Sequence, residues 1–225
     1  MTQRPSLSGP TPNRHPIADE FLLDYATGTA PEPIVVLVAT HVALNPASRT
    51  ALGQLEAAGG ALLERLEPAL VGGDALDRVL ARLDTQDREA PRMSSSPDTG
   101  LPAALRAYIP QGLEALRWRG LGGFATAALP CREKTPYKLS LLRVAAGRAF
   151  PQHGHSGMEM LLVLKGGFSD EHGHYVRGDV CLSDEAVEHR PVADPDGECL
   201  CLAVTRGPVR FKGLLGFVLK PFLRG

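Results

Sequence analysis

The chain of 225 residues and 24.0 kDa is long enough for one large domain or two small ones, and its 44% hydrophobic and 22% charged residues are typical of a folded protein. Its formal net charge of -1 gives no overall basic field, which argues against direct binding to nucleic acid. The apolar runs are too short for a membrane span, residues 1–14 lack a signal-peptide core, and the four cysteines show no disulfide framework, so we expect a cytoplasmic protein without membrane contact.

Changes in composition divide the chain into four segments. Residues 1–14 contain three prolines and predict a disordered tail, whereas residues 15–86 carry helical patterns. Residues 87–103 are polar and rich in serine and proline, as linkers are, and residues 104–225 have the texture of a β-rich domain. The second segment holds ten acidic and four basic residues, a net charge of -6, which suits a basic partner or is simply a charged helical surface.

The second segment predicts four helices that form a small all-α module. The first runs from Asp19 to Ala26 and ends at Gly28, and the second is a strongly apolar stretch ending at Leu44. Asn45 then has the character of an N-cap, with proline at the first helical position. The third and fourth helices are expected to bury leucine-rich faces in a common core, namely Leu52, Leu55, Leu62 and Leu66, and, after Asp74, Leu76, Val79, Leu80 and Leu83.

The fourth segment predicts an antiparallel β-barrel. Short apolar runs alternate with glycine-bearing turns over residues 124–129, 137–144, 160–164, 175–182 and 200–205. The apolar end, residues 211–222, is expected to pack on the barrel or, alternatively, on a partner. The fold class expected is therefore α+β, a small all-α module followed by an antiparallel barrel.

A candidate metal site lies in the stretch that contains His153, His155 and Glu159. Two histidines at i and i+2 share one face of a strand, and a bend after them returns the glutamate to the same place. His189 stands at the head of a later strand, which completes a set of three imidazoles and one carboxylate for a divalent transition metal. The spacing G-x5-H-x-H-x3-E-x6-G is similar to the first cupin motif. The alternative is that these histidines are surface residues of loops.

The arrangement of helical module, linker and cupin resembles the ChrR family of anti-sigma factors. In the front part the resemblance lies in His15-x3-Asp19, in Tyr25-x2-Gly28-Thr29 and in the run around His41; in the rear it lies in the metal-site residues, Cys199-x-Cys201 and the apolar end. The resemblance implies that the helical module sequesters an extracytoplasmic-function-type sigma factor. It also implies a cupin that binds one Zn2+, with Mn, Fe or Ni as alternatives, and that senses oxidative stress from singlet oxygen or peroxide.

One departure from the family pattern concerns metal binding by the helical module. The resemblance implies a zinc site there, built from an early histidine and a His-x3-Cys-x2-Cys motif. His15 and His41 match the two histidines, but Asn45 and Ser48 occupy the cysteine positions. Neither neutral side chain replaces a thiolate as a zinc ligand. We therefore predict a metal-free helical module in which Asn45 serves as a helix cap.

Two further pairs of residues carry weaker signals. Cys199 and Cys201 face one side of a strand; by resemblance they take part in sensing oxidants, and the alternative is two buried small hydrophobes. His172 and His174 repeat the H-x-H spacing, but their glycine neighbour predicts a hairpin turn, so they are excluded from the metal site.

Three functions are compatible with these observations. The first is the anti-sigma factor, a regulator without catalytic residues. The second is a metal-dependent cupin enzyme such as a dioxygenase or isomerase, because the same ligands serve both classes. The third is a cupin whose helical part only dimerises, which leaves a homodimer open. The acidic helical module favours the first, since an enzyme has no need of it.

Overall fold

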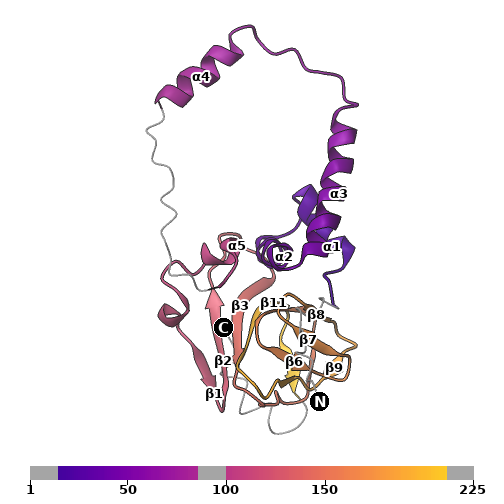
Figure 1. Cartoon of the computed structure of the whole chain (residues 1–225), viewed down its shortest axis with the longest axis vertical. Helices are drawn as coiled ribbons and strands as arrows, with labels where there is room; N and C mark the ends of the chain where they lie inside the picture. The colour runs from indigo at the N-terminus through magenta and orange to yellow at the C-terminus, as the bar shows by residue number, and fades with distance from the viewer. Residues whose placement is uncertain (1–14, 86–99, 212–225) are drawn as a thin grey trace, which may run out of the picture.

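The computed structural model describes residues 15–85 and 100–211, which form helices and three β-sheets; Figure 1 shows how the helices and strands are arranged. Helix α1 spans Asp19–Thr27, α2 Glu32–Leu44 and α3 Pro46–Leu63. Helix α1 ends at Gly28, whose φ of 71° suits a residue without a Cβ. The Asn45 side chain accepts hydrogen bonds from the backbone N–H groups of Ala47 and Ser48, which confirms its predicted role as the cap of α3.

Helix α4, Ala75–Thr85, corrects the prediction of a shared leucine core. Figure 1 shows this helix apart from the strands and from α1 and α2. Of the leucines predicted for the core, Leu52 is buried and Leu55 packs against the buried cluster. The others are between 49% and 67% exposed, namely Leu62, Leu66, Leu76, Val79, Leu80 and Leu83. The core of the helical part is instead formed by α2, which is apolar around most of its circumference and is covered by α1, α3 and the cupin sheet.

The strands form three open antiparallel sheets rather than one closed barrel, while the α+β fold class is confirmed. A six-stranded sheet has the order β1-β2-β3-β11-β5-β8, and two three-stranded sheets have the orders β10-β6-β7 and β12-β4-β9. The strands span Arg119–Leu121 (β1), Phe124–Leu129 (β2), Tyr137–Val144 (β3), His153–His155 (β4), Glu159–Lys165 (β5), Gly167–Ser169 (β6), His174–Val176 (β7), Val180–Ser183 (β8), Glu188–His189 (β9), Val192–Ala193 (β10), Cys199–Arg206 (β11) and Val209–Phe211 (β12). Two short helices, α5 (Ala103–Arg106) and the 3-10 helix η1 (Leu113–Ala115), precede them.

The central strands β5 and β11 of the six-stranded sheet are buried on both faces. On β5, Met160 and Leu162 belong to the cluster that includes the helices, whereas Leu161 and Val163 pack with Phe168 and the residues of the β10-β6-β7 sheet. Side chains alternate between the two faces of a strand, so a strand covered on both sides needs apolar residues at every position. This explains the uninterrupted apolar run of β5.

The segment before α1 joins the helical part to the cupin. The carbonyl of His15 accepts from Val180 N–H at 2.9 Å, and its N–H donates to the Asp179 carboxylate at 3.2 Å. Two residues on, Ile17 N–H donates to Nε2 of His41 in α2 at 3.3 Å. The strand β8 and the helix α2 therefore hold this segment between them.

The division of the chain into segments stays a prediction. Leu101, in the last part of the predicted linker, and Leu105 of α5 are both buried in the cluster that contains α2. The predicted tail, most of the predicted linker (residues 86–99) and the apolar end (residues 212–222) lie outside the described residues. Within the described ranges no single helix is long and apolar enough to cross a membrane; the pair α1 and α2, bent by 112°, meets that test by length and composition only.

Candidate functional site

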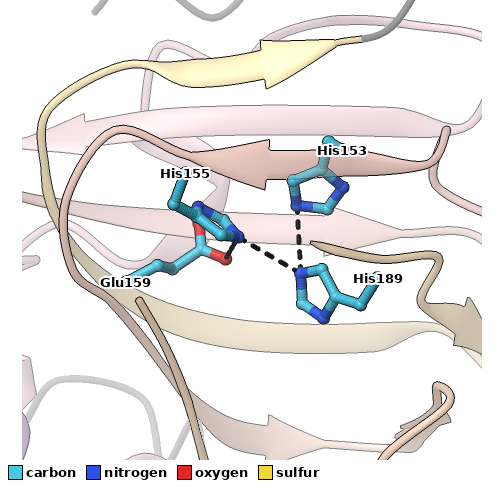
Figure 2. Close-up of side chains that lie close together, drawn as sticks. All are labelled: His153, His155, Glu159 and His189. Carbon is cyan, nitrogen blue, oxygen red and sulfur yellow. Dashed lines mark hydrogen bonds and ion pairs between the residues drawn. The ribbon is translucent and has the colours of Figure 1, made fainter. Parts of the chain in front are cut away.

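Four side chains from three strands converge at one end of the cupin interior (Figure 2). His153 and His155 lie on β4, Glu159 opens β5, and β9 pairs with β4 so that His189 stands opposite His153. The bend between β4 and β5 requires Gly157, because a Cβ there would lie 2.3 Å from the carbonyl oxygen of Arg206. The predicted bend thus brings the carboxylate back to the two histidines.

The ligand atoms of this cluster are close together and shielded from solvent. Nε2 of His189 lies 3.1 Å from Nε2 of His153 and 3.3 Å from Nε2 of His155. The Nε2 atom of His155 is in turn 3.6 Å from Oε2 of Glu159. All four residues are at most 9% exposed. One ligand atom from each of the four lies within 4.8 Å of the others, a spacing that suits a single bound ion.

The hydrogen bonds behind the rings show that the cluster fits a cation. Nδ1 of His153 lies 2.9 Å from the Pro151 carbonyl, and Nδ1 of His189 lies 2.8 Å from the Asp170 carboxylate. Both partners only accept hydrogen bonds, so each Nδ1 carries the proton and each Nε2 keeps its lone pair. Two lone pairs that face each other at 3.1 Å repel unless a cation lies between them. The residues present therefore fit a metal ion.

The protonation states of the cluster also suit metal ligands. Burial, followed by the electrostatic interaction with the neighbouring His189, lowers the pKa of His153 to about 3 and that of His155 to about 4. Both imidazoles are consequently neutral at pH 7, as a metal ligand must be. Burial raises the pKa of Glu159 to about 7, because the charged carboxylate loses its hydration. A bound cation would restore a partner for that charge.

The second group of predicted residues, in the helical part, is only partly brought together. His41 and Ser48 are hydrogen bonded, with Nε2 and Oγ 2.8 Å apart, and Asn45 caps the helix beside them. All three are at most 3% exposed. His15 is not part of this group: its ring packs on Tyr175 of the cupin, with 4.4 Å between the ring centroids.

His41 is held as a neutral ring. Burial lowers its pKa to about 4, and the Gly178 carbonyl and the Asp179 carboxylate offset part of that change. Ile17 N–H donates to Nε2, so the Ser48 hydroxyl also donates to this atom and the ring proton sits on Nδ1. Nδ1 of His41 and Nδ2 of Asn45 are buried without a hydrogen-bond partner among the described residues.

Comparison with known proteins identifies the family. The model of the ChrR cupin-like domain matches residues 111–210. The anti-sigma-E factor ChrR of Cereibacter sphaeroides is 40% identical over 213 residues, which are 94% of this chain and 98% of that protein. The chain belongs to the ChrR family of anti-sigma factors. The crystal structure of Rhodobacter sphaeroides SigE in complex with the anti-sigma ChrR is similar with a TM-score of 0.73 and 38% identity, over 85% of this chain and 98% of that one.

Family membership answers the choice between regulator and enzyme. The 40% identical relative is an anti-sigma factor, which is a regulator. This agrees with the regulator predicted for this chain, and the dioxygenase or isomerase alternative is set aside. Membership in the ChrR family and the cluster of three histidines and one glutamate together indicate a metal site.

The paired cysteines of this family member lie inside the cupin but away from the cluster. Sγ of Cys199 is 3.6 Å from Sγ of Cys201, and both residues are 2% exposed. On β11, Thr205 pairs with Glu159 while Cys201 pairs with Val163, four residues further along β5. The hydrogen bond that the Cys201 thiol donates to Cys199, together with burial, raises the pKa of Cys201, so the reactive thiolate is disfavoured.

The sequence did not single out the residues behind the cluster. Asp170 and the Pro151 carbonyl support two of the rings, and Cys181 lies with Asp170 and His189 in a group whose ligand atoms are within 4.8 Å. No spacing rule relates Asp170 to His189, since the contact depends on how two sheets meet. The one sequence signal for Asp170 was its place just before the His172–His174 hairpin. His174 of that hairpin bonds to Asp194 and not to the cluster.

Proposed function

We propose that this chain binds an extracytoplasmic-function-type sigma factor and keeps it from RNA polymerase. The observation that carries the proposal is the similarity, over most of both chains, to a ChrR protein whose crystal structure is a complex with SigE. Sigma factors act on RNA polymerase, so the proposal includes a cytoplasmic location. The net charge of -6 over residues 15–86 suits the basic surface expected of a protein that acts on nucleic acid.

The exposed leucines supply a surface for that partner. On α4, Leu76, Val79, Leu80 and Leu83 recur at helical spacing and form one apolar stripe, which is between 49% and 67% exposed. The end of α3, which Figure 1 shows apart from α4, carries a separate exposed pair, Leu62 and Leu63, at 65% and 68%. An uncovered apolar surface of this extent marks an interaction site. We assign it to the sigma factor.

A transcription assay tests the anti-sigma activity with the full chain and the cognate sigma factor. The double variant Leu80→Gln/Leu83→Gln should lose repression, because it removes apolar contact area from the stripe. Asp77→Gln changes the same helix at an acidic position and serves as the control, which should repress like the wild type. Equal repression by the double variant and the wild type would show that the partner binds elsewhere.

We further propose that the cupin holds one Zn2+ through His153, His155, Glu159 and His189. Neutral imidazoles and a carboxylate are ligands that zinc accepts in a four-coordinate site, and the repulsion between the facing lone pairs supports a cation at this place. Mn, Fe or Ni would use the same donors. When bound, zinc would supply a positive charge that keeps Glu159 ionised, and its ligands would link β4, β5 and β9.

The cupin site is proposed to control release of the sigma factor. Glu159 faces the cluster, and the next residue, Met160, faces the helices, where it lines an apolar cleft of about 320 Å³ with Ile17 and Phe21. Packing between the start of α1 and the sheet is therefore incomplete at Met160, the residue that follows Glu159 in β5. A change at Glu159 has a direct path through Met160 to the helical part.

The inducing signal follows from the family resemblance. We propose singlet oxygen or organic peroxide, with Cys199 and Cys201 as candidate thiols. His155→Ala should leave repression intact and abolish induction, whereas His174→Ala, a histidine outside the cluster, should respond like the wild type. Normal induction of the His155→Ala variant would separate signal sensing from the metal cluster.

The helical part is proposed to hold no metal. The Ser48 hydroxyl satisfies the ring nitrogen of His41, and the Asn45 side chain satisfies two N–H groups at the start of α3. His15, the other histidine of the predicted site, is engaged with the cupin. Hydrogen bonds therefore already occupy the ring nitrogen of His41 and the side-chain oxygen of Asn45 that could otherwise face a metal.

A further inference from the structure

The turn between β6 and β7 forms hydrogen bonds to His189 and to the residue after it. Asp170 begins this turn, and its side chain is fully buried. One carboxylate oxygen, Oδ2, accepts from Nδ1 of His189 at 2.8 Å, while Oδ1 accepts from the N–H groups of His172 and Gly173 at 2.8 and 3.1 Å. The next residue, Glu171, accepts from the backbone N–H of Arg190 at 3.0 Å. The turn therefore holds both the ring of His189 and the chain just after it.

These contacts have two consequences for His189. The hydrogen bond to Asp170 fixes the plane of the ring, and it places the proton on Nδ1, which leaves the lone pair of Nε2 directed at His153 and His155. A carboxylate behind an imidazole also raises the electron density at the opposite nitrogen, and it adds a negative charge near the cation site. The backbone carbonyl of Pro151 gives His153 a similar contact, but without the charge.

We propose that Asp170 is a positioning residue for the metal centre and sets how tightly the cupin holds its ion. The inference rests on the proposed metal site and adds to it a part of the chain, the β6–β7 turn, on which metal affinity depends. The competing explanation is that Asp170 only shapes the turn through its bonds to His172 and Gly173.

The variant Asp170→Asn separates these two roles. An asparagine has nearly the same size and keeps an oxygen that accepts from the turn. Its amide, however, donates where the carboxylate accepted, so His189 has to carry its proton on Nε2, the atom that faces the ion. The chain offers a matched control in Asp194→Asn, since Asp194 forms the same kind of pair with His174 at 2.9 Å, in a half-exposed position outside the cluster.

The first measurement is zinc affinity of the full chain by competition with a chromophoric chelator. Asp170→Asn should weaken zinc binding by roughly 10- to 100-fold, as outer partners of metal-bound histidines do, and Asp194→Asn should change it by less than about threefold. If the wild type binds zinc and Asp170→Asn binds it equally well, the role of Asp170 is overturned. If the wild type binds no zinc, the proposed metal centre itself fails, and this inference fails with it.

The second measurement determines the tautomer of His189 directly, in protein from which a chelator has removed the metal. Ring 15N shifts should show His189 protonated at Nδ1 in the wild type and at Nε2 in Asp170→Asn, a change that a purely structural role would not produce. Asp170→Ser, which keeps an oxygen for the turn but is too short to reach the ring, serves if the asparagine variant does not fold. It should also lose affinity, and unchanged zinc binding by a folded Asp170→Ser chain would overturn the proposal.

Discussion

The cupin and the helical part each bury a histidine-centred cluster, and the two clusters differ in what lies on the far side of the rings. In the cupin, acceptors behind His153 and His189 hold the protons at Nδ1 and leave lone pairs facing each other. In the helical part, the Ser48 hydroxyl donates to the inward nitrogen of His41. Buried histidines are therefore not equivalent: the first arrangement leaves facing lone pairs that need a cation, whereas in the second a hydroxyl already donates to the inward nitrogen.

The largest expected effect tests the incomplete cluster. His189→Ala or Glu159→Ala should lower bound zinc sharply from about one equivalent, because each variant removes one of the four ligands and weakens binding of the ion. Metal analysis of the purified full chain measures this, with His174→Ala as a control that keeps its zinc. Two equivalents in the wild type would contradict the metal-free helical part.

The second prediction concerns a metal site built into the helical part by substitution. The double variant Asn45→Cys/Ser48→Cys should gain a second equivalent of zinc, since two thiolates beside His41 replace a cap and a hydroxyl with strong ligands. The same metal analysis applies, with Ala47→Cys/Thr50→Cys, two nearby positions on α3, as a control. A failure to gain metal would mean that the placement of His15 on the cupin prevents this group from forming a site.

The third prediction concerns acid. The folded-state pKa of His41 is lowered to about 4 from an ordinary value of 6.5, so the folded chain binds this proton less readily than the unfolded chain. The stability that depends on a neutral His41 is fully present above pH 6.5 and is lost as the pH falls towards 4. The free energy of unfolding should decrease by about 3 kcal/mol over this range.

Urea unfolding of the chelated protein between pH 7 and pH 4 measures this loss. His153 and His155 have lowered pKa values too and add to the total, so the contribution of His41 is the difference between the wild type and His41→Gln. An identical pH dependence of the two proteins would show that His41 titrates normally.

The smallest effect tests the cap. Asn45→Ala should lower the free energy of unfolding by about 1 kcal/mol, because two N–H groups at the start of α3 lose their acceptor. Asn45→Ser keeps an oxygen at this position and should lose less. Urea unfolding at pH 7, with and without zinc, gives both values. A loss for Asn45→Ala that depends on zinc would instead place this residue in a metal site.

Residues close together in the sequence were enough to predict the histidine and glutamate cluster and the helix cap. The two histidines at i and i+2 and the glutamate after a glycine bend specify their own juxtaposition, because strand periodicity and a short turn leave little choice. The cap at Asn45 followed from the proline after it for a similar reason. Where the leucines would pack was predicted wrongly, since an amphipathic pattern shows that a face is apolar and not what covers it.

The sequence by itself predicted the α+β class and the family, and it singled out the three histidines and the glutamate that lie together in the cupin, because residue types at short spacings indicate each of them. Only the tertiary structure decided which side chains stand behind the rings, since Asp170 reaches His189 through the meeting of two sheets. It likewise decided that His15 lies on Tyr175 rather than beside His41, and that the leucines of α4 remain uncovered. Contacts between distant segments depend on packing, for which no local spacing rule exists.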